Sequence, residues 1–440
     1  MSVPLSTRSI GGALAGIVGR DGMIDDPTRL AAHAVDGVVP RWSIRASAVE
    51  QVATVLALAS EEGLAVVPRG SGSALDLGHP PARVDIVLDV RPMDRIVEDN
   101  PDDLTVSVEA GLTAGSLASR LASRRQLLPV DPPGLGARTL GGLVATAASG
   151  PLRARYGTLR DLLLGVRFVQ ADGVVTWGGA RVVKSVTGYD VPKLMVGSLG
   201  TLGVICELTL RLHPRPEAEA TCLATFDSVE AATAFVARLL DSRLEPNRIE
   251  FLNGAALARL GSQGRAACAV SVGSVEAAVR EEMATLDVFA GEAGGTSAPA
   301  AADFWATYGS MMLSAGRALM LHVASPPSRL AATVSAVERG LTALAPGESA
   351  VVAGCAALGT LEVMLPAAAV PIAPQLIDGL RESLATLEGH AIVRRAPVEV
   401  RRRVDPWGPV EPGVMALMHG LRDEFDPRRV LNPGRFVGGL

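Results

Sequence analysis

The sequence predicts an α+β protein with more than one domain. Its 440 residues, 48% of them hydrophobic, exceed what a single hydrophobic core usually holds. Segments with a helical apolar pattern and segments with an alternating one follow each other along the chain. Pro214 and Pro216 interrupt these patterns near the middle, so we expect a domain boundary after residue 215.

The first half begins with a helix and a buried strand. Residues 47–63 contain Ser47 and Glu50 in the spacing of a capping box, then an apolar stripe that Gly63 ends. The buried strand covers residues 64–68. Further strands are expected at residues 84–89, 95–98, 104–109, 166–170, 174–177 and 204–212, and a further helix at residues 114–124. Asp172-Gly173 predicts a type I′ hairpin between two of these strands.

In residues 218–400, the same order of strands and helices occurs twice. In the first set we expect helices after Asp227 and Gly273, and strands at residues 222–226, near 249 and at 267–272. In the second set we expect helices after Ser325 and at residues 372–387, and strands at residues 318–323, 350–354, 360–365 and 391–395. We interpret these sets as two β-α-β-β-α-β units that form one extended antiparallel sheet with helices on one face.

Composition argues against several classes of protein. A net charge of −5 gives no broad attraction to nucleic acid. No apolar run approaches the ~20 residues of a membrane-spanning helix, and we interpret the Gly-rich stretch 10–19 as a folded segment, not a signal peptide. The cysteines are far apart, which argues against an iron–sulfur or zinc site and fits a reducing compartment: they are Cys206, Cys222, Cys268 and Cys355. We expect a cytoplasmic protein that reaches a membrane only through partners.

Three glycine-rich loops predict a site for a phosphate-bearing cofactor. The first, Arg69-Gly-Ser-Gly-Ser73, follows a buried strand, and its backbone amides can form a nest for a pyrophosphate. The second runs from Asp131 to Gly150, where small residues let a flat ring or a phosphate approach the backbone. The third, Val196-Gly-Ser-Leu-Gly-Thr-Leu-Gly203, adds the hydroxyls of Ser198 and Thr201. A plain turn or a packed helix explains any one loop, but three in one half favour a cofactor.

A Rossmann fold is the main alternative for the first loop. Its fingerprint would need a third glycine at position 75, where Leu75 stands. Asp89 lies near the spacing of the ribose-binding acid, but the segment after the loop predicts a turn and a strand, not a helix. We therefore reject the Rossmann interpretation.

These loops, in this order, resemble the vanillyl-alcohol-oxidase-type (PCMH-type) FAD-binding domain over about residues 18–213. The matching stretches are Val67-Pro-Arg-Gly-Ser-Gly-Ser73, Leu104-Thr-Val-Ser-Val-Glu-Ala-Gly111, Thr139-Leu-Gly-Gly142, Arg155-Tyr-Gly157 and Gly197-Ser-Leu-Gly-Thr-Leu-Gly-Val204. Residues 425–435 resemble the segment with which this family returns to its flavin domain. The resemblance implies a two-part FAD-binding domain over residues 1–215, an α/β-sandwich cap of ferredoxin-like repeats over 216–405, and a returning segment over 406–440.

Within this family, the chain resembles the FAD-binding E subunit of bacterial glycolate oxidase. The stretches that carry this are Arg181-Val-Val-Lys-Ser-Val-Thr-Gly-Tyr-Asp190, Leu194-Met-Val-Gly-Ser198 and Gly389-His-Ala391. Catalytic D-2-hydroxyacid dehydrogenases of the superfamily carry a metal-binding stretch similar to His-x-Gly-Asp-Gly-Asn-x-His, which this chain lacks. We expect no metal site, because the six histidines are scattered: they are His33, His79, His213, His322, His390 and His419. The second half is longer than expected of the E subunit, which leaves the partner set open.

The resemblance implies non-covalent FAD. The backbone at Arg69, Gly70, Ser71, Gly72 and Ser73 is expected to hold the pyrophosphate. Main-chain groups of Val204 and Ile205 are expected to contact the adenine or the flavin, and Asn432 to lie near the isoalloxazine. The other expected cofactor-binding residues are Pro132, Thr139, Gly141, Gly142, Ala145, Gly197, Ser198, Gly200 and Thr201. Ser73 stands where some relatives carry a flavin-linking histidine, which excludes a covalent bond there.

The resemblance also implies an oxidoreductase acting on CH–OH groups, and three versions stay open. In the first, the flavin oxidises a 2-hydroxy acid such as glycolate or D-lactate. The preferred catalytic candidates are Arg155, Tyr156, His322 and His390, ahead of Arg153, Tyr189 and Arg394. In the second, the chain is a relay or assembly subunit beside a catalytic flavin subunit and an iron–sulfur subunit. In the third, it is a stand-alone alcohol or sugar oxidase. A structural role competes with the catalytic one for each candidate.

Overall fold

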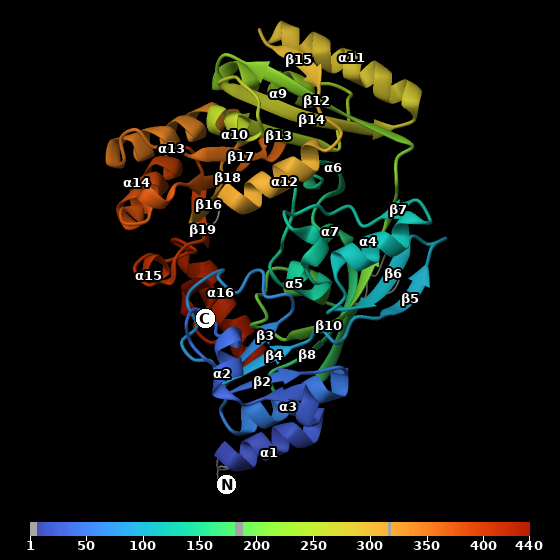
Figure 1. Ribbon diagram of the computed structural model, residues 1–440, viewed down its shortest axis with the longest axis vertical. Coiled ribbons are helices and arrows are strands. Elements are labelled where there is room, and N and C mark those ends of the chain that lie inside the picture. The colour runs from blue at the N-terminus through green and yellow to red at the C-terminus, as the bar shows by residue number, and fades with distance from the viewer. Residues whose placement is uncertain (1–6, 181–187, 316–317) are drawn as a thin grey trace.

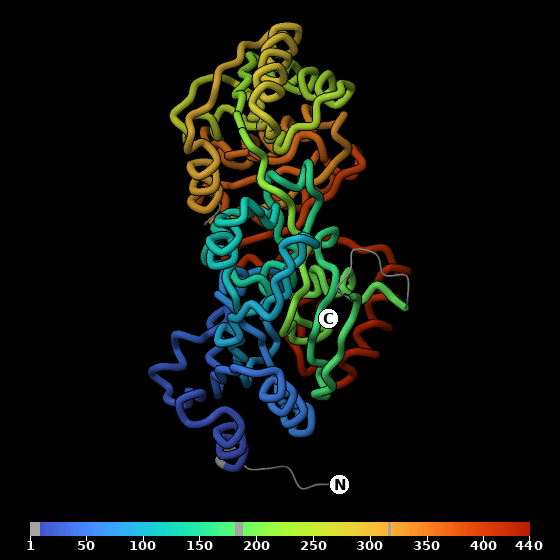
Figure 2. The backbone as a smooth tube through the Cα atoms, turned by 90° about the vertical axis from the view of Figure 1, so that its right-hand side faces the viewer, coloured from blue at the N-terminus to red at the C-terminus, as the bar shows by residue number. Residues whose placement is uncertain are grey.

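The computed structural model describes residues 7–180, 188–315 and 318–440. Residues 181–187, part of one stretch that resembles the glycolate oxidase subunit, lie outside the described residues. The two halves of the chain are stacked along the long axis of the molecule (Figure 1). The N-terminal half forms the lower part and the later strands form the upper part, while the red C-terminal segment returns to the lower part (Figure 2).

The lower part begins with a four-stranded sheet in the order β1-β2-β4-β3. Its strands are β1 (Met23–Ile24), β2 (Trp42–Arg45), β3 (Val66–Arg69) and β4 (Ile86–Asp89). The ladders β2–β4 and β3–β4 are parallel, and β1–β2 is antiparallel. Helices α1 (Thr7–Val18) and α3 (Val49–Glu61) share a hydrophobic core with this sheet. The short helix α2 (Pro27–Leu30) lies in the connection between β1 and β2.

The helix expected near residues 47–63 is confirmed, but its capping box is wrong. The helix begins at Val49 after Ala48, one residue later than the box requires. The amide and hydroxyl of Ser47 both donate to Oε1 of Gln51, at 2.8 and 3.2 Å. Because the start shifts by one residue, Glu50 stands too early in the helix to reach back to the cap.

A second, five-stranded antiparallel sheet completes the lower part in the order β5-β6-β10-β8-β9. Its strands are β5 (Ile96–Asn100), β6 (Thr105–Glu109), β8 (Leu163–Val169), β9 (Val175–Gly179) and β10 (Val204–Arg211). The helices around it are α4 (Ala114–Ala122), α5 (Leu140–Ala145), α6 (Arg153–Tyr156), α7 (Leu159–Leu162) and α8 (Val191–Met195). A small ladder joins β7 (Gln126–Leu127) to β11 (His213–Pro214).

The β8–β9 hairpin is confirmed, but its turn differs from the expected type I′. The Gln170 amide donates a hydrogen bond to the Val174 carbonyl, so the three residues between them form the loop. Gly173 alone among them has a positive φ, +90°, whereas type I′ needs two. Asp172 instead accepts a hydrogen bond from the Val174 amide through its side chain, at 3.0 Å.

The upper part is one eight-stranded antiparallel sheet in the order β15-β12-β14-β13-β17-β18-β16-β19. The strands are β12 (Ala218–Phe226), β13 (Arg248–Asn253), β14 (Ala266–Ser274), β15 (Thr296–Pro299), β16 (Leu319–Ala324), β17 (Val351–Cys355), β18 (Thr360–Leu365) and β19 (His390–Arg395). Its main helices are α9 (Val229–Leu240), α11 (Glu276–Glu292), α13 (Leu330–Leu344) and α14 (Ala373–Ala385). This sheet confirms the expected α+β class and the double set of strands and helices.

The two faces of the upper sheet are covered differently. The four main helices and one face share a large core that includes Leu321 and Val363. Two helices that we did not expect, α10 (Gly254–Arg259) and α12 (Phe304–Ala315), pack in a smaller core on the other face. This second face turns toward the lower part, with α12 beside it (Figure 1).

The C-terminal segment runs from α15 (Val398–Arg401) through α16 (Pro412–Phe425) back to the first sheet. Leu431 pairs with Val66 in a parallel bridge, and the Asn432 amide donates to the Val66 carbonyl at 2.9 Å. The segment therefore lies beside β3. The expected boundaries after residues 215 and 405 stay predictions. Within the described ranges, no helix combines the length and the apolar character needed to cross a bilayer.

Candidate functional site

The three glycine-rich loops meet around a cavity of about 110 Å³, here called the glycine-loop cavity. Most of the expected cofactor-binding residues line it: Arg69, Gly70, Ser71, Gly72, Ser73, Thr139, Gly141, Gly142, Ala145, Gly200, Val204, Ile205 and Asn432. Leu75, Val90, Thr146, Leu199 and Arg435 also line it, and sequence reasoning did not single them out as cofactor contacts.

The first loop approaches the second so closely that a side chain cannot stand between them. A Cβ atom on Gly70 would lie 2.1 Å from Oγ1 of Thr139. Gly72 has a φ of +79°, which favours glycine. Behind the loop, Arg69 contacts Nδ1 of His33 at 3.3 Å. The glycines of this loop therefore leave its backbone open to the cavity.

The second loop leads into α5, whose small residues form the opposite wall. Thr139 precedes the helix, and its Oγ1 is buried without a hydrogen-bond partner in the described structure. A Cβ atom on Gly141 would lie 2.7 Å from that of Ala110, so the helix packs directly on the strand end behind it. Gly141 is thus required by close packing, as the packed-helix interpretation also expected.

The third loop is tied to α5 by backbone hydrogen bonds. The amides of Gly197 and Leu199 donate to the carbonyls of Val144 and Ala145, at 2.9 and 2.8 Å. Leu199 has a φ of +50° and Gly200 one of +65°. Gly197, Ser198 and Thr201 lie behind the cavity wall, and Thr201 Oγ1 donates to the Ser198 carbonyl at 2.7 Å.

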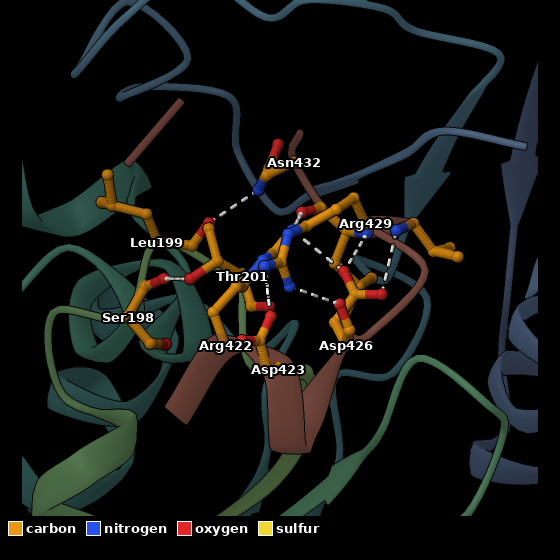
Figure 3. A network of polar contacts seen from close by, with 10 residues as sticks. Ser198, Leu199, Thr201, Arg422, Asp423, Asp426, Arg429 and Asn432 are labelled. Carbon is orange, nitrogen blue, oxygen red and sulfur yellow. Dashed lines mark hydrogen bonds and ion pairs between the residues drawn. The ribbon is translucent and has the colours of Figure 1, made fainter. Parts of the chain in front are cut away.

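A buried polar network joins the third loop to the C-terminal segment (Figure 3). Arg422 of α16 donates to the carbonyl of Thr201 and, at 2.5 Å, to that of Leu431. It also forms an ion pair with Asp426 at 2.9 Å. Asn432 Nδ2 donates to the Leu199 carbonyl at 2.6 Å, while its Oδ1 is buried without a partner among the residues described.

The glycine-loop cavity has the features that FAD needs. Backbone amides and two arginines, Arg69 and Arg435, suit a pyrophosphate. Burial lowers the pKa of Arg435 to about 10, which leaves it charged at neutral pH. Apolar side chains such as Leu75 and Val90 suit a flat ring. The unpartnered Oγ1 of Thr139 and Oδ1 of Asn432 are polar atoms that a ligand can satisfy.

A second cavity of about 310 Å³, here called the arginine cavity, lies between the lower part and the upper sheet. It shares Ser71, Ser73, Ala74, Leu77 and Thr146 with the glycine-loop cavity, so the two adjoin. Pro132 lies in this second cavity and not in the first. The upper part contributes Met312, Leu313, Met320, Glu362, Arg394 and Arg395.

The arginine cavity carries an excess of positive charge. Burial, and then repulsion from Arg394 and Arg395, lowers the pKa of Arg138 to about 10. Arg395 is neutralised by Asp76, which follows the first loop: its Nε lies 2.7 Å from Oδ2 of Asp76. Among the described ion pairs, neither Arg138 nor Arg394 has a carboxylate partner. Two arginines in a partly closed cavity form a place for an anion.

The four catalytic candidates do not form one site, although His322 and His390 lie on the paired strands β16 and β19 and interact. His322 stands in the upper sheet, where its Nδ1 lies 2.7 Å from Oε1 of Glu362, a residue of the cavity wall. His390 is exposed at the beginning of β19. Neither Arg155 nor Tyr156 lines either cavity.

The positions of the two residues of α6 have a simple physical cause. Arg155 pairs with Glu245 at 2.5 Å, and Tyr156 packs edge-on against His213, with ring centroids 5.0 Å apart. Their helix packs against β13 of the upper sheet, which turns them away from the glycine loops. The catalytic roles assigned to them from sequence therefore have no support from their surroundings.

Sequence reasoning missed Arg138 and Glu362. Arg138 directly precedes Thr139, so its place beside a cofactor loop was a usable signal. Glu362 alternates with apolar residues in β18, which is typical of any strand with one solvated face. Over the described part of the chain, no three histidine, cysteine or acidic side chains gather as metal ligands.

Two family models match the chain in tandem. The FAD binding domain model matches residues 40–179, and the model for the C-terminal domain of FAD linked oxidases matches residues 215–356. The glycolate oxidase subunit GlcD of Bacillus subtilis is 32% identical over 204 residues, 46% of this chain and 43% of that one. The match therefore spans less than half of that relative.

Two further relatives are named as a D-lactate dehydrogenase and as another glycolate oxidase subunit. A probable mitochondrial D-lactate dehydrogenase of Danio rerio is 29% identical over 88% of this chain and 82% of that one. The glycolate oxidase subunit GlcE of Escherichia coli is 39% identical over 154 residues, 35% of this chain and 43% of that one.

Solved structures show the same fold at low identity. p-Cresol methylhydroxylase superposes with a TM-score of 0.79 at 16% identity, over 98% of both chains. An alkyldihydroxyacetonephosphate synthase superposes with a TM-score of 0.75 at 15% identity, over 99% of this chain and 87% of that one. The tandem family matches and the related sequences lead to one conclusion: the chain belongs to the vanillyl-alcohol-oxidase-type (PCMH-type) FAD-dependent oxidoreductases, and its cofactor is FAD.

Proposed function

We propose that the protein oxidises a 2-hydroxy acid, such as glycolate or D-lactate, to the 2-oxo acid. The observation that carries this proposal is the arginine cavity, which adjoins the glycine-loop cavity and holds two arginines without carboxylate partners among the described ion pairs. Two of the relatives are named as glycolate oxidase subunits and one as a probable D-lactate dehydrogenase, which supports the same substrate class.

The two cavities would bind different parts of the cofactor and the substrate. Backbone at residues 69–73 would hold the pyrophosphate of FAD, and Val204 and Ile205 would line the adenine end. The larger arginine cavity is lined by residues from both halves of the molecule. It therefore suits the part of the cofactor that must contact a substrate. When bound, FAD supplies a two-electron acceptor for the hydride of a CH–OH carbon.

The chain's own residues then bind and orient the acid. Arg138 and Arg394 present guanidinium groups that can hold a carboxylate through charge-assisted hydrogen bonds. Met312, Leu313 and Met320 form apolar wall on the side of the upper sheet. Exclusion of water by this wall strengthens the attraction between the arginines and the carboxylate.

A place in a complex is a second candidate role. Two relatives are named as subunits of glycolate oxidase, and this favours a chain that passes electrons to partner subunits, one of them with an iron–sulfur centre. Under this proposal the protein is cytoplasmic and reaches a membrane only through those partners.

The test is anaerobic reduction of the purified FAD-loaded chain. Glycolate and D-lactate are expected to bleach the flavin absorbance, whereas ethanol and glucose, which have no carboxylate, are not. Bleaching by an uncharged alcohol or a sugar would indicate a stand-alone alcohol or sugar oxidase. A flavin that none of these compounds reduces would contradict a substrate site in this chain and favour the relay role.

A further inference from the structure

Two neighbouring strands of the upper sheet, β16 and β18, present polar residues on the face that turns toward the lower part. In β16 and β18, His322 is directly opposite Glu362. The apolar neighbours Leu321 and Val363 point to the other face, into the large helix-covered core. Glu362 therefore stands on the face that borders the arginine cavity, and it lines that cavity.

The two side chains are in contact. His322 Nδ1 and Glu362 Oε1 lie 2.7 Å apart, and their side chains are 13% and 22% exposed. The other carboxylate oxygen, Oε2, is buried without a hydrogen-bond partner in the part of the chain described. One oxygen of Glu362 is thus occupied by the histidine, and the second is left for another donor.

Two other carboxyl groups near this cavity are not available as proton acceptors. Asp76 is paired with Arg395 at 2.7 Å. Glu250 accepts a hydrogen bond from Tyr308 at 2.5 Å and does not line the cavity. Burial raises the pKa of Glu250 to about 8, so it is largely protonated at neutral pH.

Glu362 is held in its charged form. Burial works against ionisation, but the charge of His322 and its hydrogen bond outweigh burial and lower the pKa of Glu362 below its ordinary value. Arg394 and Arg153 act in the same direction, while Glu250 faces the group from β13. A carboxylate with one free oxygen therefore shares the cavity with Arg138 and Arg394.

We propose that Glu362 is the proton acceptor for the substrate hydroxyl and that His322 is its positioning residue. This rests on the proposed oxidation of a 2-hydroxy acid. In the step, the C–H bond would break with loss of a hydride, the two-electron equivalent that FAD, when bound, would accept. The O–H bond breaks as well: its electron pair forms the carbonyl π bond, and its proton bonds to the free oxygen of Glu362. The acid is oxidised to a 2-oxo acid, and the proton later leaves to solvent.

The first test compares Glu362→Gln with the wild-type chain, both loaded with FAD. D-lactate is expected to reduce the flavin of E362Q about 10²- to 10⁴-fold more slowly, the usual contribution of a positioned base. Oxalate, an unreactive dianion, is expected to perturb the flavin spectrum of both proteins and to bind E362Q at least as tightly as wild type, because the arginines remain and a like charge is removed. Glu382→Gln, at an exposed position of α14, is the matched control and is expected to keep the wild-type rate.

The second test separates positioning from a structural role. Asparagine at position 322 can still donate a hydrogen bond to Glu362, and leucine cannot. His322→Asn is therefore expected to restore most of the reduction rate that His322→Leu loses. In the wild type, the rate of reduction is expected to fall at acid pH as Glu362 becomes protonated. H322L is expected to move this fall to higher pH, because the imidazole and the hydrogen bond that stabilise the carboxylate are gone.

The outcomes are distinguishable. If no 2-hydroxy acid reduces the wild-type flavin, the proposed function fails and the role of Glu362 fails with it. If D-lactate reduces the wild type and E362Q equally fast, with the same pH profile, the function stands and the inference about Glu362 is wrong. If E362Q does not load FAD, the two variants at His322 decide: equal rates and equal pH profiles in H322N and H322L overturn the inference.

Discussion

Arg422 donates a hydrogen bond to the main-chain carbonyl of Thr201, although 221 residues separate them in the chain. The arginine is buried together with Asp426, and it also holds the carbonyl of Leu431. Asp426 in turn accepts hydrogen bonds from the amides of Val430 and Leu431, at 2.9 and 2.8 Å. The C-terminal segment and the third glycine loop are therefore held as one unit around the FAD site.

Replacement of Arg422 is expected to destabilise both the C-terminal segment and the third glycine loop. Arg422→Met leaves Asp426 as a buried charge without its partner, which typically costs about 3–5 kcal/mol. Urea denaturation monitored by circular dichroism measures the loss, and a parallel titration with FAD is expected to show weaker binding. Arg403→Met, at an exposed position of the same chain, is the control and is expected to change stability by less than about 0.5 kcal/mol. An R422M protein as stable as wild type would mean that the network does not hold the segment.

Gly70 is expected to be indispensable for FAD binding. In Gly70→Val the new Cβ would lie 2.1 Å from Oγ1 of Thr139, so the first two loops must move apart and the backbone nest opens. Gly200→Val adds a Cβ at a φ of +65°, 3.3 Å from Asn432 Nδ2, and is expected to act in the same way. The flavin content of the purified protein checks both variants.

Gly379→Ala is the matched control for these substitutions. This glycine lies inside α14, and a Cβ there meets nothing within 4 Å. The variant is expected to keep full flavin and to gain up to about 1 kcal/mol of stability, because alanine favours a helix interior. Full flavin in G70V would contradict the role of the first loop.

The arginine cavity is expected to lose affinity for carboxylates when either free arginine is removed. Hydrogen bonds to charged groups are worth about 1.5–3 kcal/mol, so Arg138→Met or Arg394→Met is expected to weaken oxalate binding about 10- to 150-fold. Spectral titration of the FAD-loaded protein measures this affinity. Arg403→Met serves again as the surface control. Unchanged oxalate affinity in both variants would show that the anion binds elsewhere.

Glu250 is expected to make stability depend on pH. Burial raises its pKa in the folded protein from 4.5 to about 8, so the folded state holds a proton that the unfolded chain releases. The stabilisation is complete below about pH 4.5 and is lost as pH rises toward about 8, by at most about 5 kcal/mol at 1.36 kcal/mol per unit. Glu250→Gln, which can still accept from Tyr308, is expected to flatten this decline. Denaturation at about pH 5 and about pH 8 compares the two proteins; parallel declines would contradict the buried acid as their source.

Local patterns in the sequence predicted much of the fold. The apolar stripe of α3, the double set of strands and helices, and the β8–β9 hairpin all follow from patterns among residues close in the chain. Errors of one residue, such as the cap of α3, arose because neighbouring polar side chains compete for the same helix end. The unexpected helix α12 packs its apolar residues against strands of the upper sheet that are distant in the chain.

The candidate site was only partly accessible to the same reasoning. The glycine loops were predictable, because close backbone approach and positive φ require glycine wherever they occur. Arg155 and Tyr156 belong to a stretch typical of the family, but a contact with β13 directs them away from the cavities.

The sequence by itself therefore determined the class of fold, the glycine loops and, through them, the family and its FAD. Only the tertiary structure decided which side chains share a cavity. Arg138 and Arg394 come from different halves of the molecule, and Glu362 meets His322 only through the pairing of β16 with β18. Periodicity and turn chemistry act over a few residues. These side-chain contacts depend on how whole sheets and helices pack, and no local pattern encodes that packing.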